Sequence, residues 1–273
     1  MASVFGAGDN EQIAKKQESM LAGQQQSIST EQHQTISSGI PGFDESLGQG
    51  LSTGNIYLLT GTVGAGIEQF AQQVLYTTLI TKSKITYYNL ENSSSDIVQD
   101  MKGYNMNIQP YVDDGSWKFA RVIPQNMKKV IEAFPEEPME ERIYLDESFT
   151  GLMNHFYDSV KNKRNTVLHL TSLARNYSLE EIQNLLTYMK GMARGFGGIH
   201  FLILTHDAIP QTTAVTIKDI ADTVFDTETA FRGNEVENTI SITKIRNMIP
   251  KTRKIRLTQR ETGLFTETIR RIQ

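Results

Sequence analysis

A short apolar segment, residues 56–60, runs directly into a glycine-rich segment, residues 61–66. Apolar side chains then recur at helical spacing at Phe70, Val74 and Leu79. This order predicts a buried strand, a tight loop and a helix. Such a loop directs backbone N–H groups and the positive end of a helix at one point, which is typical of a phosphate-binding unit. The two outer glycines alone favour a plain tight turn between a strand and a helix, so the prediction of a phosphate-binding unit depends on the surrounding sequence.

Apolar strands alternate with helices along most of the chain. Further strands are predicted at residues 85–90, near 117–120, at 166–171 and at 200–205, and helices at 96–103, 149–161 and 179–194. Because these strands are almost continuously apolar, they predict a mostly parallel central sheet covered by helices on both faces, which is an α/β fold. Apolar residues near 240–242, 255–257 and 264–265 predict antiparallel strands at the C-terminal edge of that sheet.

The first 35 residues differ in composition from the rest of the chain. They are rich in Gln, Ser, Ala and Gly, so we predict a disordered tail over residues 1–35 and one folded domain over 36–273. The chain has no cysteine and its histidines are scattered, so no disulfide, thiol nucleophile or metal centre is expected. No apolar run reaches the ~20 residues that span a bilayer, and no export signal is recognisable. We therefore expect a cytoplasmic protein that is not inserted in a membrane.

The formal net charge of −4 conceals two regions of opposite sign. From residue 244 to 273, nine basic residues stand against Glu261 and Glu267, which gives +7. The other residues hold 18 basic and 29 acidic side chains, or −11. Such a basic region suits a phosphate group, an acidic partner or a neighbouring subunit, and composition alone does not choose among these.

The glycine-rich segment matches only part of the phosphate-binding pattern G-x-x-x-x-G-K-[ST]. Gly61 and Gly66 are in place, but Ile67 and Glu68 stand where the lysine and the hydroxyl residue belong. A missing lysine removes a contact worth about 1.5–3 kcal/mol, and a carboxylate ~4 Å from a phosphate oxygen adds about 1–4 kcal/mol of repulsion. Together these lower the affinity for a nucleotide by about two to five orders of magnitude.

Ordinary ATP binding is therefore not expected, and no cofactor is predicted. ATP and Mg²⁺ would bind only if Glu68 held a cation, or if a basic side chain from elsewhere replaced the lysine. The residues that would bind a nucleotide in that case are those of the degenerate loop: Thr62, Val63, Gly64, Ala65, Gly66, Ile67 and Glu68.

The sequence around this loop resembles the KaiC-type branch of the RecA superfamily. The resemblance rests on residues 38–48 (SGIPGFDESLG), on the glycines before the strand, on residues 87–92 (YYNLEN) and on Lys244-Ile245-Arg246. It extends from about residue 36 to the C-terminus. The resemblance implies a RecA-like three-layer αβα fold, which in this branch often assembles into rings or filaments with ATP between subunits.

Within this branch, residues 108–111, 205–210 and 263–264 are similar to the archaellum accessory protein family, which implies an archaeal source. Members of that family usually keep an ATP-binding loop, which this chain lacks. A KaiC-like protein, an archaellum accessory protein and a recombinase paralogue therefore all stay open.

Carried over position by position, the resemblance implies a nucleotide site that has lost most of its charged groups. Of two adjacent catalytic acids after the second strand, Glu91 remains as the candidate catalytic base, and Asn92 replaces the other. For Glu91 the alternative is a solvated acid at a strand end. The magnesium-binding aspartate falls on Thr171. Because phosphoryl transfer depends on such charges, these losses indicate a pseudo-ATPase.

The resemblance also makes Lys244 and Arg246 candidates for contacts between subunits. For Arg246 the choice lies between reaching a neighbour's site and lying as a plain basic residue on an exposed edge strand.

Three functions follow from these observations. The first is a catalytically degenerate assembly or regulatory subunit that binds RecA-type partners in a homo- or hetero-oligomer. The second is a weak or partner-dependent ATPase that uses Glu91 and Glu68. The third is a recombinase paralogue whose C-terminal basic residues bind nucleic acid, namely Lys251, Arg253, Lys254 and Arg256. The scarcity of aromatic residues among these basic ones disfavours the third.

Overall fold

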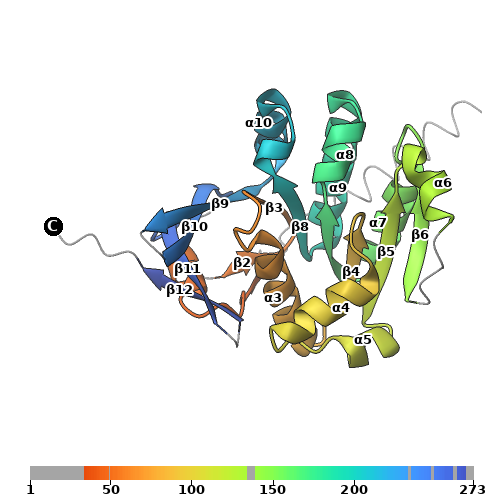
Figure 1. Ribbon diagram of the computed structural model, residues 1–273. Coiled ribbons are helices and arrows are strands. Elements are labelled where there is room, and N and C mark those ends of the chain that lie inside the picture. The colour runs from red at the N-terminus through yellow and green to blue at the C-terminus, as the bar shows by residue number, and fades with distance from the viewer. Residues whose placement is uncertain are drawn as a thin grey trace, which may run out of the picture. The chain divides into compact units, whose positions relative to one another are not determined.

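A computed structural model describes residues 34–48, 50–133, 139–232, 235–246, 249–260 and 263–268. The predicted disordered tail lies outside these residues except for its last two, so it stays a prediction. The described residues are built around a sheet with the strand order β12-β11-β10-β9-β3-β8-β7-β4-β5-β6 (Figure 1). A separate small sheet pairs β1 (Thr35–Ile36) with β2 (Leu51–Ser52) in antiparallel fashion.

The strands of the large sheet divide into a parallel and an antiparallel part. They are β3 (Asn55–Gly61), β4 (Lys84–Asn89), β5 (Trp117–Ile123), β6 (Glu140–Tyr144), β7 (Arg164–His169), β8 (Ile199–Thr205), β9 (Thr223–Arg232), β10 (Glu235–Lys244), β11 (Lys254–Arg260) and β12 (Gly263–Thr268). All neighbours from β9 through β3 to β6 are parallel. The pairs from β9 to β12 are antiparallel. The predicted fold class is confirmed.

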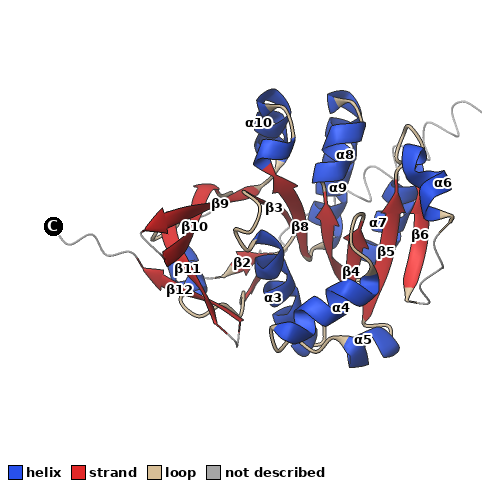
Figure 2. Cartoon of the chain, viewed as in Figure 1, coloured by secondary structure: helices blue, strands red, loops and turns tan. Residues whose placement is uncertain are grey.

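Helices pack on both faces of the sheet (Figure 2). The helices are α2 (Phe43–Leu47), α3 (Ile67–Ile80), α4 (Ser94–Gly103), α5 (Gln109–Asp113), α6 (Lys128–Ile131), α7 (Thr150–Lys161), α8 (Thr171–Asn176), α9 (Leu179–Phe196) and α10 (Gln211–Ile220), with single 3₁₀ turns at η1 (Gln125–Met127) and η2 (His206–Ala208). One core cluster joins α2, α3 and α4 to the sheet, and the other joins α7 to α10. Among the described residues, no helix is long and apolar enough to cross a bilayer.

Strand β3 shows how one apolar run supplies both cores. Tyr57 and Leu59 belong to the cluster under α3, whereas Ile56 and Leu58 belong to the cluster under α9. Successive side chains of a strand point to opposite faces, so a strand buried on both sides is apolar along most of its length instead of alternating with polar residues. This explains why the sequence pattern predicted the position of β3 closely.

The structure differs from the sequence-based expectation at two strands. The strand expected at 166–171 ends at His169, because Leu170 adopts helical backbone angles and Thr171 begins α8. Strand β6 was not expected at all. It pairs only with β5 at the edge of the described sheet and carries charges at three of its five positions, so it lacks an apolar run.

Aromatic rings anchor the helix that follows the glycine loop. The ring of Phe70 on α3 packs edge-on against Phe43 of α2 at 4.9 Å between ring centres. Phe70 also meets Phe201 of β8 at 6.4 Å and Phe225 of β9 at 5.9 Å. These rings are fully buried, and aromatic pairs in this geometry add to the stabilisation from burial. The first turn of α3, and therefore the loop before it, has a fixed position on the sheet.

A buried histidine makes the fold sensitive to acid. His200 on β8 is fully buried, with Nδ1 3.0 Å from the Thr166 hydroxyl and Nε2 2.9 Å from the Gly197 carbonyl oxygen. Because a carbonyl only accepts, Nε2 carries the proton and Nδ1 accepts from Thr166. Burial lowers the pKa of His200 to about 4, so the ring is neutral in the folded chain at neutral pH.

We expect stability to decrease as the pH falls from 6.5, the ordinary histidine pKa, towards about 4. In this range the unfolded chain binds a proton that the folded chain does not, and the loss reaches about 3 kcal/mol. Urea unfolding of the wild type and of His200→Gln at several pH values checks this. The variant should lack this one-proton dependence, and equal pH profiles for the two proteins would contradict the assignment.

Candidate functional site

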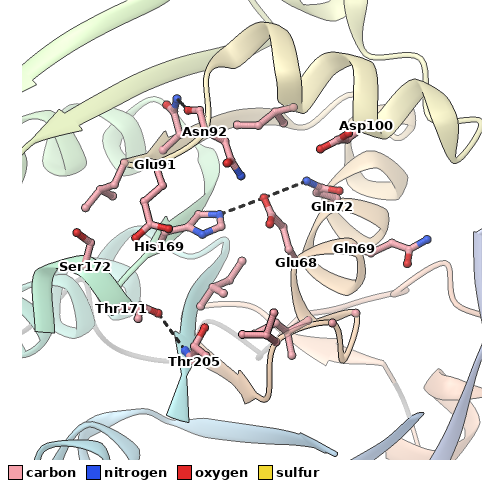
Figure 3. Close-up of a pocket in the computed structure, with 18 of the residues that line it drawn as sticks. Glu68, Gln69, Gln72, Glu91, Asn92, Asp100, His169, Thr171, Ser172 and Thr205 are labelled. Carbon is pink, nitrogen blue, oxygen red and sulfur yellow. Dashed lines mark hydrogen bonds and ion pairs between the residues drawn. The ribbon is translucent and has the colours of Figure 1, made fainter. Parts of the chain in front are cut away.

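A pocket of about 440 Å³ opens at the carboxyl ends of the parallel strands (Figure 3). The loop after β3 forms one wall, and Asn89, His169 and Thr205 contribute to the pocket from the ends of β4, β7 and β8. Residues of α3 and α4, together with Gln259 of β11, complete the lining. Parallel α/β sheets place ligands at this end of their strands.

The glycine loop has the shape that a phosphate-binding loop needs. Gly64 and Gly66 have φ angles of 82° and 75°, in the left-handed region that favours glycine. The loop closes with a hydrogen bond from the Ala65 N–H to the Thr62 carbonyl oxygen at 3.2 Å. Helix α3 begins directly after Gly66. The predicted strand–loop–helix unit therefore forms, and its backbone frame is intact.

Both residues after the loop line the pocket, but Ile67 also packs into the core. Ile67, at the lysine position, is only 8% exposed and belongs to the core cluster beneath α3. Glu68, at the hydroxyl position, lines the pocket. Its Oε1 accepts a hydrogen bond from the Tyr87 hydroxyl at 2.7 Å and one from the Gln72 amide at 3.4 Å, and lies 3.4 Å from His169 Nε2. Figure 3 shows this contact with His169 across the pocket.

This network keeps Glu68 ionised. Burial alone would raise the pKa of Glu68, but the hydrogen bond and charge of His169, with the Tyr87 hydroxyl, outweigh burial and hold it below its ordinary value. Burial and the nearby Glu68 carboxylate raise the pKa of Tyr87, so this hydroxyl stays protonated and donates. A fixed negative charge therefore stands beside the loop.

A second polar group lies at the end of β4. The Asn89 amide nitrogen donates to the Asn92 carbonyl oxygen at 2.7 Å and to Glu140 Oε1 at 2.8 Å. The same oxygen accepts from the Ser94 backbone N–H at 2.7 Å, which fixes the start of α4. Glu140 also lies 3.6 Å from Arg121. Asn89 Oδ1 is buried without a hydrogen-bond partner among the described residues.

Glu91 and Thr171 both line the same pocket as the loop. Glu91 is exposed, and its carboxylate makes no hydrogen bond or ion pair within the described parts of the chain. The Thr171 hydroxyl accepts a hydrogen bond from the Thr205 N–H at 3.0 Å, as Figure 3 shows. The structure thus brings together the loop, Glu91 and Thr171, as the resemblance implied. Their roles stay predictions.

Lys244 and Arg246 lie at the other end of the parallel strands, near the start of β9. Arg246 is 3.1 Å from the carboxylate of Asp222, and Lys244 donates to the Asp219 carbonyl oxygen. Both side chains are about two-fifths exposed (40% and 41%). They are separate from the pocket of their own chain. Whether they contact a neighbouring subunit stays a prediction.

Asp222 forms ion pairs with three basic side chains. Its Oδ1 lies 3.1–3.2 Å from Lys190, Arg194 and Arg246, and its Oδ2 accepts from the Ile56 N–H at 3.2 Å. The Asp222 side chain is fully buried. Burial works against its charge, but the N–H and the three cations hold the pKa of Asp222 below its ordinary value. The cluster joins α9 and the end of β10 to the start of β3.

The charged side chains that line the pocket are mainly acidic. Its described lining includes the carboxylates of Glu68, Glu91 and Asp100 and one histidine, His169, but no lysine or arginine. No three His, Asp or Glu side chains of the described residues gather closely enough to hold a metal ion. Sequence reasoning missed Tyr87, His169 and Asn89 as parts of this site. The signal for His169 was a polar residue at the end of an otherwise apolar strand.

Two of the C-terminal basic residues proposed for nucleic acid are paired within the chain. Lys254 lies 3.1 Å from Glu228, and Arg256 lies 2.9 Å from Glu237. These ion pairs reduce the positive charge that this surface offers to a phosphate backbone.

The parallel sheet, the glycine loop at its centre and the pocket beside that loop define a RecA-like protein with a P-loop frame. Residues 36–264 match the family model of the KaiC ATPase, so the chain belongs to the KaiC family. Family membership does not by itself establish catalysis.

Relatives and solved structures agree with this placement. A circadian clock protein KaiC3 from Synechocystis is 30% identical over 33% of this chain and 18% of that protein. A UPF0273 protein from Methanopyrus kandleri is 32% identical over 29% of this chain and 32% of that protein. The matches thus span a third or less of these two relatives. The archaeal source implied by the sequence stays a prediction.

Among solved structures, a KaiC-like protein from Pyrococcus horikoshii superimposes with a TM-score of 0.68 and 20% identity, covering 86% of this chain and 100% of that one. The flagellar accessory protein FlaH from Methanocaldococcus jannaschii gives a TM-score of 0.64 and 17% identity, covering 82% and 94%. At these identities the likeness shows the fold. The predicted KaiC-type placement, with FlaH as a structural neighbour, is confirmed.

Proposed function

We propose that this chain is a catalytically degenerate member of the KaiC family, a pseudo-ATPase that acts as an assembly or regulatory subunit. The observation that carries the proposal is the lining of the pocket: its described residues include no lysine or arginine, and the ionised carboxylate of Glu68 stands where a hydroxyl would hold Mg²⁺.

A triphosphate would meet repulsion in this pocket. Its oxygens accept hydrogen bonds and carry negative charge, whereas Glu68 Oε1 already takes the donors of Tyr87 and Gln72. Without the lysine, the loop offers only uncharged donors, namely its backbone N–H groups and the Thr62 hydroxyl. The loss of affinity of about two to five orders of magnitude places ordinary ATP binding beyond the range in which a nucleotide would be held.

The retained scaffold supports a role in assembly. A parallel sheet of the RecA type, the partly exposed Lys244 and Arg246, and the basic C-terminal region together provide a surface for a RecA-type partner, either a second copy or a related chain. Charge complementarity of this kind favours specific association. The absence of cysteine is compatible with work in the cytoplasm.

Isothermal titration of the full chain with Mg²⁺–ATP tests the proposal, together with thermal unfolding in the presence and absence of the nucleotide. We expect no saturable heat and no increase in Tm, because a ligand raises Tm only when it binds the folded state. A magnesium-dependent affinity for ATP in the low micromolar range would contradict the proposal.

One observation favours a second function, a partner-dependent ATPase. The carboxylate of Glu91 lines the pocket without any ion pair among the described residues, so it is available as a base. A partner would then have to supply the missing positive charge. Turnover should appear only when the partner is added, and it should be absent for Glu91→Gln. Equal rates of ATP hydrolysis by the variant and the wild type would rule out this function.

A further inference from the structure

Basic side chains line the end of the sheet opposite the pocket, where the parallel strands begin. Strands β8, β7 and β4 are neighbours in the sheet, and they begin at nearly the same level. The basic side chains at their starts are all exposed, and they are Lys82 and Lys84 before β4, Lys161 and Lys163 before β7, and Arg194 before β8. We call these five residues the basic strip.

Most of the charge of the basic strip is unpaired. Among the described residues, no carboxylate forms an ion pair with the four lysines of the strip. Arg164, buried at the start of β7, donates through its guanidinium to backbone carbonyl oxygens instead of a carboxylate. Exposed acids border the strip at Asp158 in α7 and at Asp113 and Asp114 before β5. A band of positive charge therefore runs across the starts of three strands.

Two lysines of the strip adopt a backbone conformation that favours other residues. The φ angle is 70° at Lys82, in the turn from α3 to β4, and 57° at Lys163, in the turn from α7 to β7. This left-handed region costs most residues roughly 1–2 kcal/mol and suits glycine or asparagine. Neither turn selects lysine for its backbone, so the feature that the two positions share is the charged side chain. Residues held in such conformations cluster at functional sites.

Aromatic rings lie beside the basic strip. Lys161 Nζ lies 5.5 Å from the ring centre of Tyr157, and this ring packs edge-on against Phe196 at 5.7 Å between ring centres. Lys163 donates to the Phe196 carbonyl oxygen at 3.0 Å. Both rings are partly exposed. Basic side chains next to aromatic rings are typical of surfaces that bind single-stranded nucleic acid, where the phosphates meet the cations and the bases stack on the rings.

The dimensions of the strip suit a short stretch of nucleic acid. Neighbouring β-strands lie ~4.8 Å apart, so the strip extends over ~10 Å from β8 to β4. About three phosphates, spaced ~3.4 Å as in one strand of a duplex, fit along this length. The acidic pocket lies at the other end of β-strands of six or seven residues, ~20 Å away. Salt screens its repulsion, because the Debye length is about 8 Å at physiological ionic strength.

We propose that the basic strip binds a single strand of nucleic acid, DNA or RNA, without dependence on its sequence. The lysines contact the phosphates, and Tyr157 and Phe196 stack on the bases. This surface is distinct from the C-terminal Lys254 and Arg256, which are paired with acids of the chain. It also lies at the opposite end of the β-strands from the pocket, so the proposal does not depend on whether ATP binds.

Fluorescence anisotropy of a labelled DNA strand of about 20 nucleotides, titrated with the full chain, tests the proposal. We expect binding at about 50 mM salt and an affinity about 20-fold lower at about 200 mM, because about three phosphates release their counterions. The duplex of the same sequence should bind more weakly, because its bases are not free to stack on the rings. No binding of the single strand at the lower salt concentration, or tighter binding of the duplex, would overturn the proposal.

A double variant places the binding on the basic strip. Lys82→Asn with Lys163→Asn removes two charges, and asparagine tolerates the left-handed backbone, so the fold should be retained, which urea unfolding verifies. We expect the affinity for the DNA strand to fall at least about tenfold, and the slope of log affinity against log salt to become shallower by about 1.4. The matched control is Lys128→Gln with Lys129→Gln, two exposed lysines of α6 outside the strip. The same affinity in both double variants would overturn the assignment.

Three further ligands separate the possible sources of the phosphates and the charge. The RNA strand of the same sequence is titrated in the same way. Similar affinities for DNA and RNA support recognition through phosphates and stacking alone, whereas a preference of about tenfold or more assigns the site to the preferred one. Inorganic polyphosphate and an oligoglutamate peptide carry negative charge without bases. If either displaced the labelled strand as well as unlabelled DNA of equal total charge, an acidic partner would replace nucleic acid and the proposal would be overturned.

Discussion

The double variant Ile67→Lys with Glu68→Thr is expected to bind Mg²⁺–ATP about two to five orders of magnitude more tightly than the wild type. It restores a cation and a hydroxyl at the two positions that follow an intact loop. Gly64 and Gly66 already have the left-handed φ angles that the loop requires, and α3 is held on the sheet by Phe70. The gain should therefore come from side chains alone, and titration with Mg²⁺–ATP measures it.

A neutral double variant is the control for this result. Ile67→Met with Glu68→Gln removes the carboxylate but adds neither the cation nor the hydroxyl. We expect it to recover only the part of the affinity that repulsion by Glu68 removes, about one to three orders of magnitude. If the lysine–threonine variant bound no better than this control, the backbone of the loop, rather than its missing side chains, would be the obstacle.

The second large expected effect is a loss of stability on substitution of Asp222, which lies at the end of the parallel strands opposite the pocket. Asp222→Asn should lower the free energy of unfolding by about 3 kcal/mol. The Asn side chain still accepts from the Ile56 N–H, but Lys190, Arg194 and Arg246 lose the one carboxylate they share. Solvent screens part of their mutual repulsion, because the two arginines are 47% and 41% exposed.

Urea unfolding at neutral pH measures this loss. The folded-state pKa of Asp222 is lowered, so its contribution is complete above the ordinary aspartate pKa and disappears as the pH falls below it. Asp219→Asn is the matched control, since its carboxylate is 90% exposed and 3.9 Å from Lys244. The control should keep the wild-type midpoint. A similar midpoint for both variants would mean that the Asp222 cluster does not stabilise the fold.

The sequence predicts the buried half of this fold well, for a physical reason. Strands such as β3 and β8 are buried on both faces, so their apolar runs stand out. Strand β6 lies at the edge of the described sheet, where charged residues are tolerated, and therefore it has no such run. The break after His169 depends on the backbone of Leu170, which no local pattern reveals.

The candidate site is predictable only in part. The loop and Glu91 were found because they match a known pattern in the sequence. The partners of Glu68 were not, because Tyr87 and His169 come from other strands and meet it only in the folded chain. The unpartnered oxygen of Asn89 depends in turn on Glu140, a residue of the unexpected strand β6. Contacts between elements distant in sequence depend on strand order, which no local pattern in the sequence reveals.

The internal bonds of Glu68 have a consequence for the physiology of the protein. The Tyr87 hydroxyl of β4 holds the first turn of α3, and with it the end of the loop, through this carboxylate. A ligand that does not bind adds nothing to the stability of the folded state. If the chain binds no nucleotide, as proposed, nucleotide binding would add nothing to the stability of its folded state. That stability would then be independent of the ratio of ATP to ADP, so an assembly built on this subunit would persist when the energy supply of the cell falls.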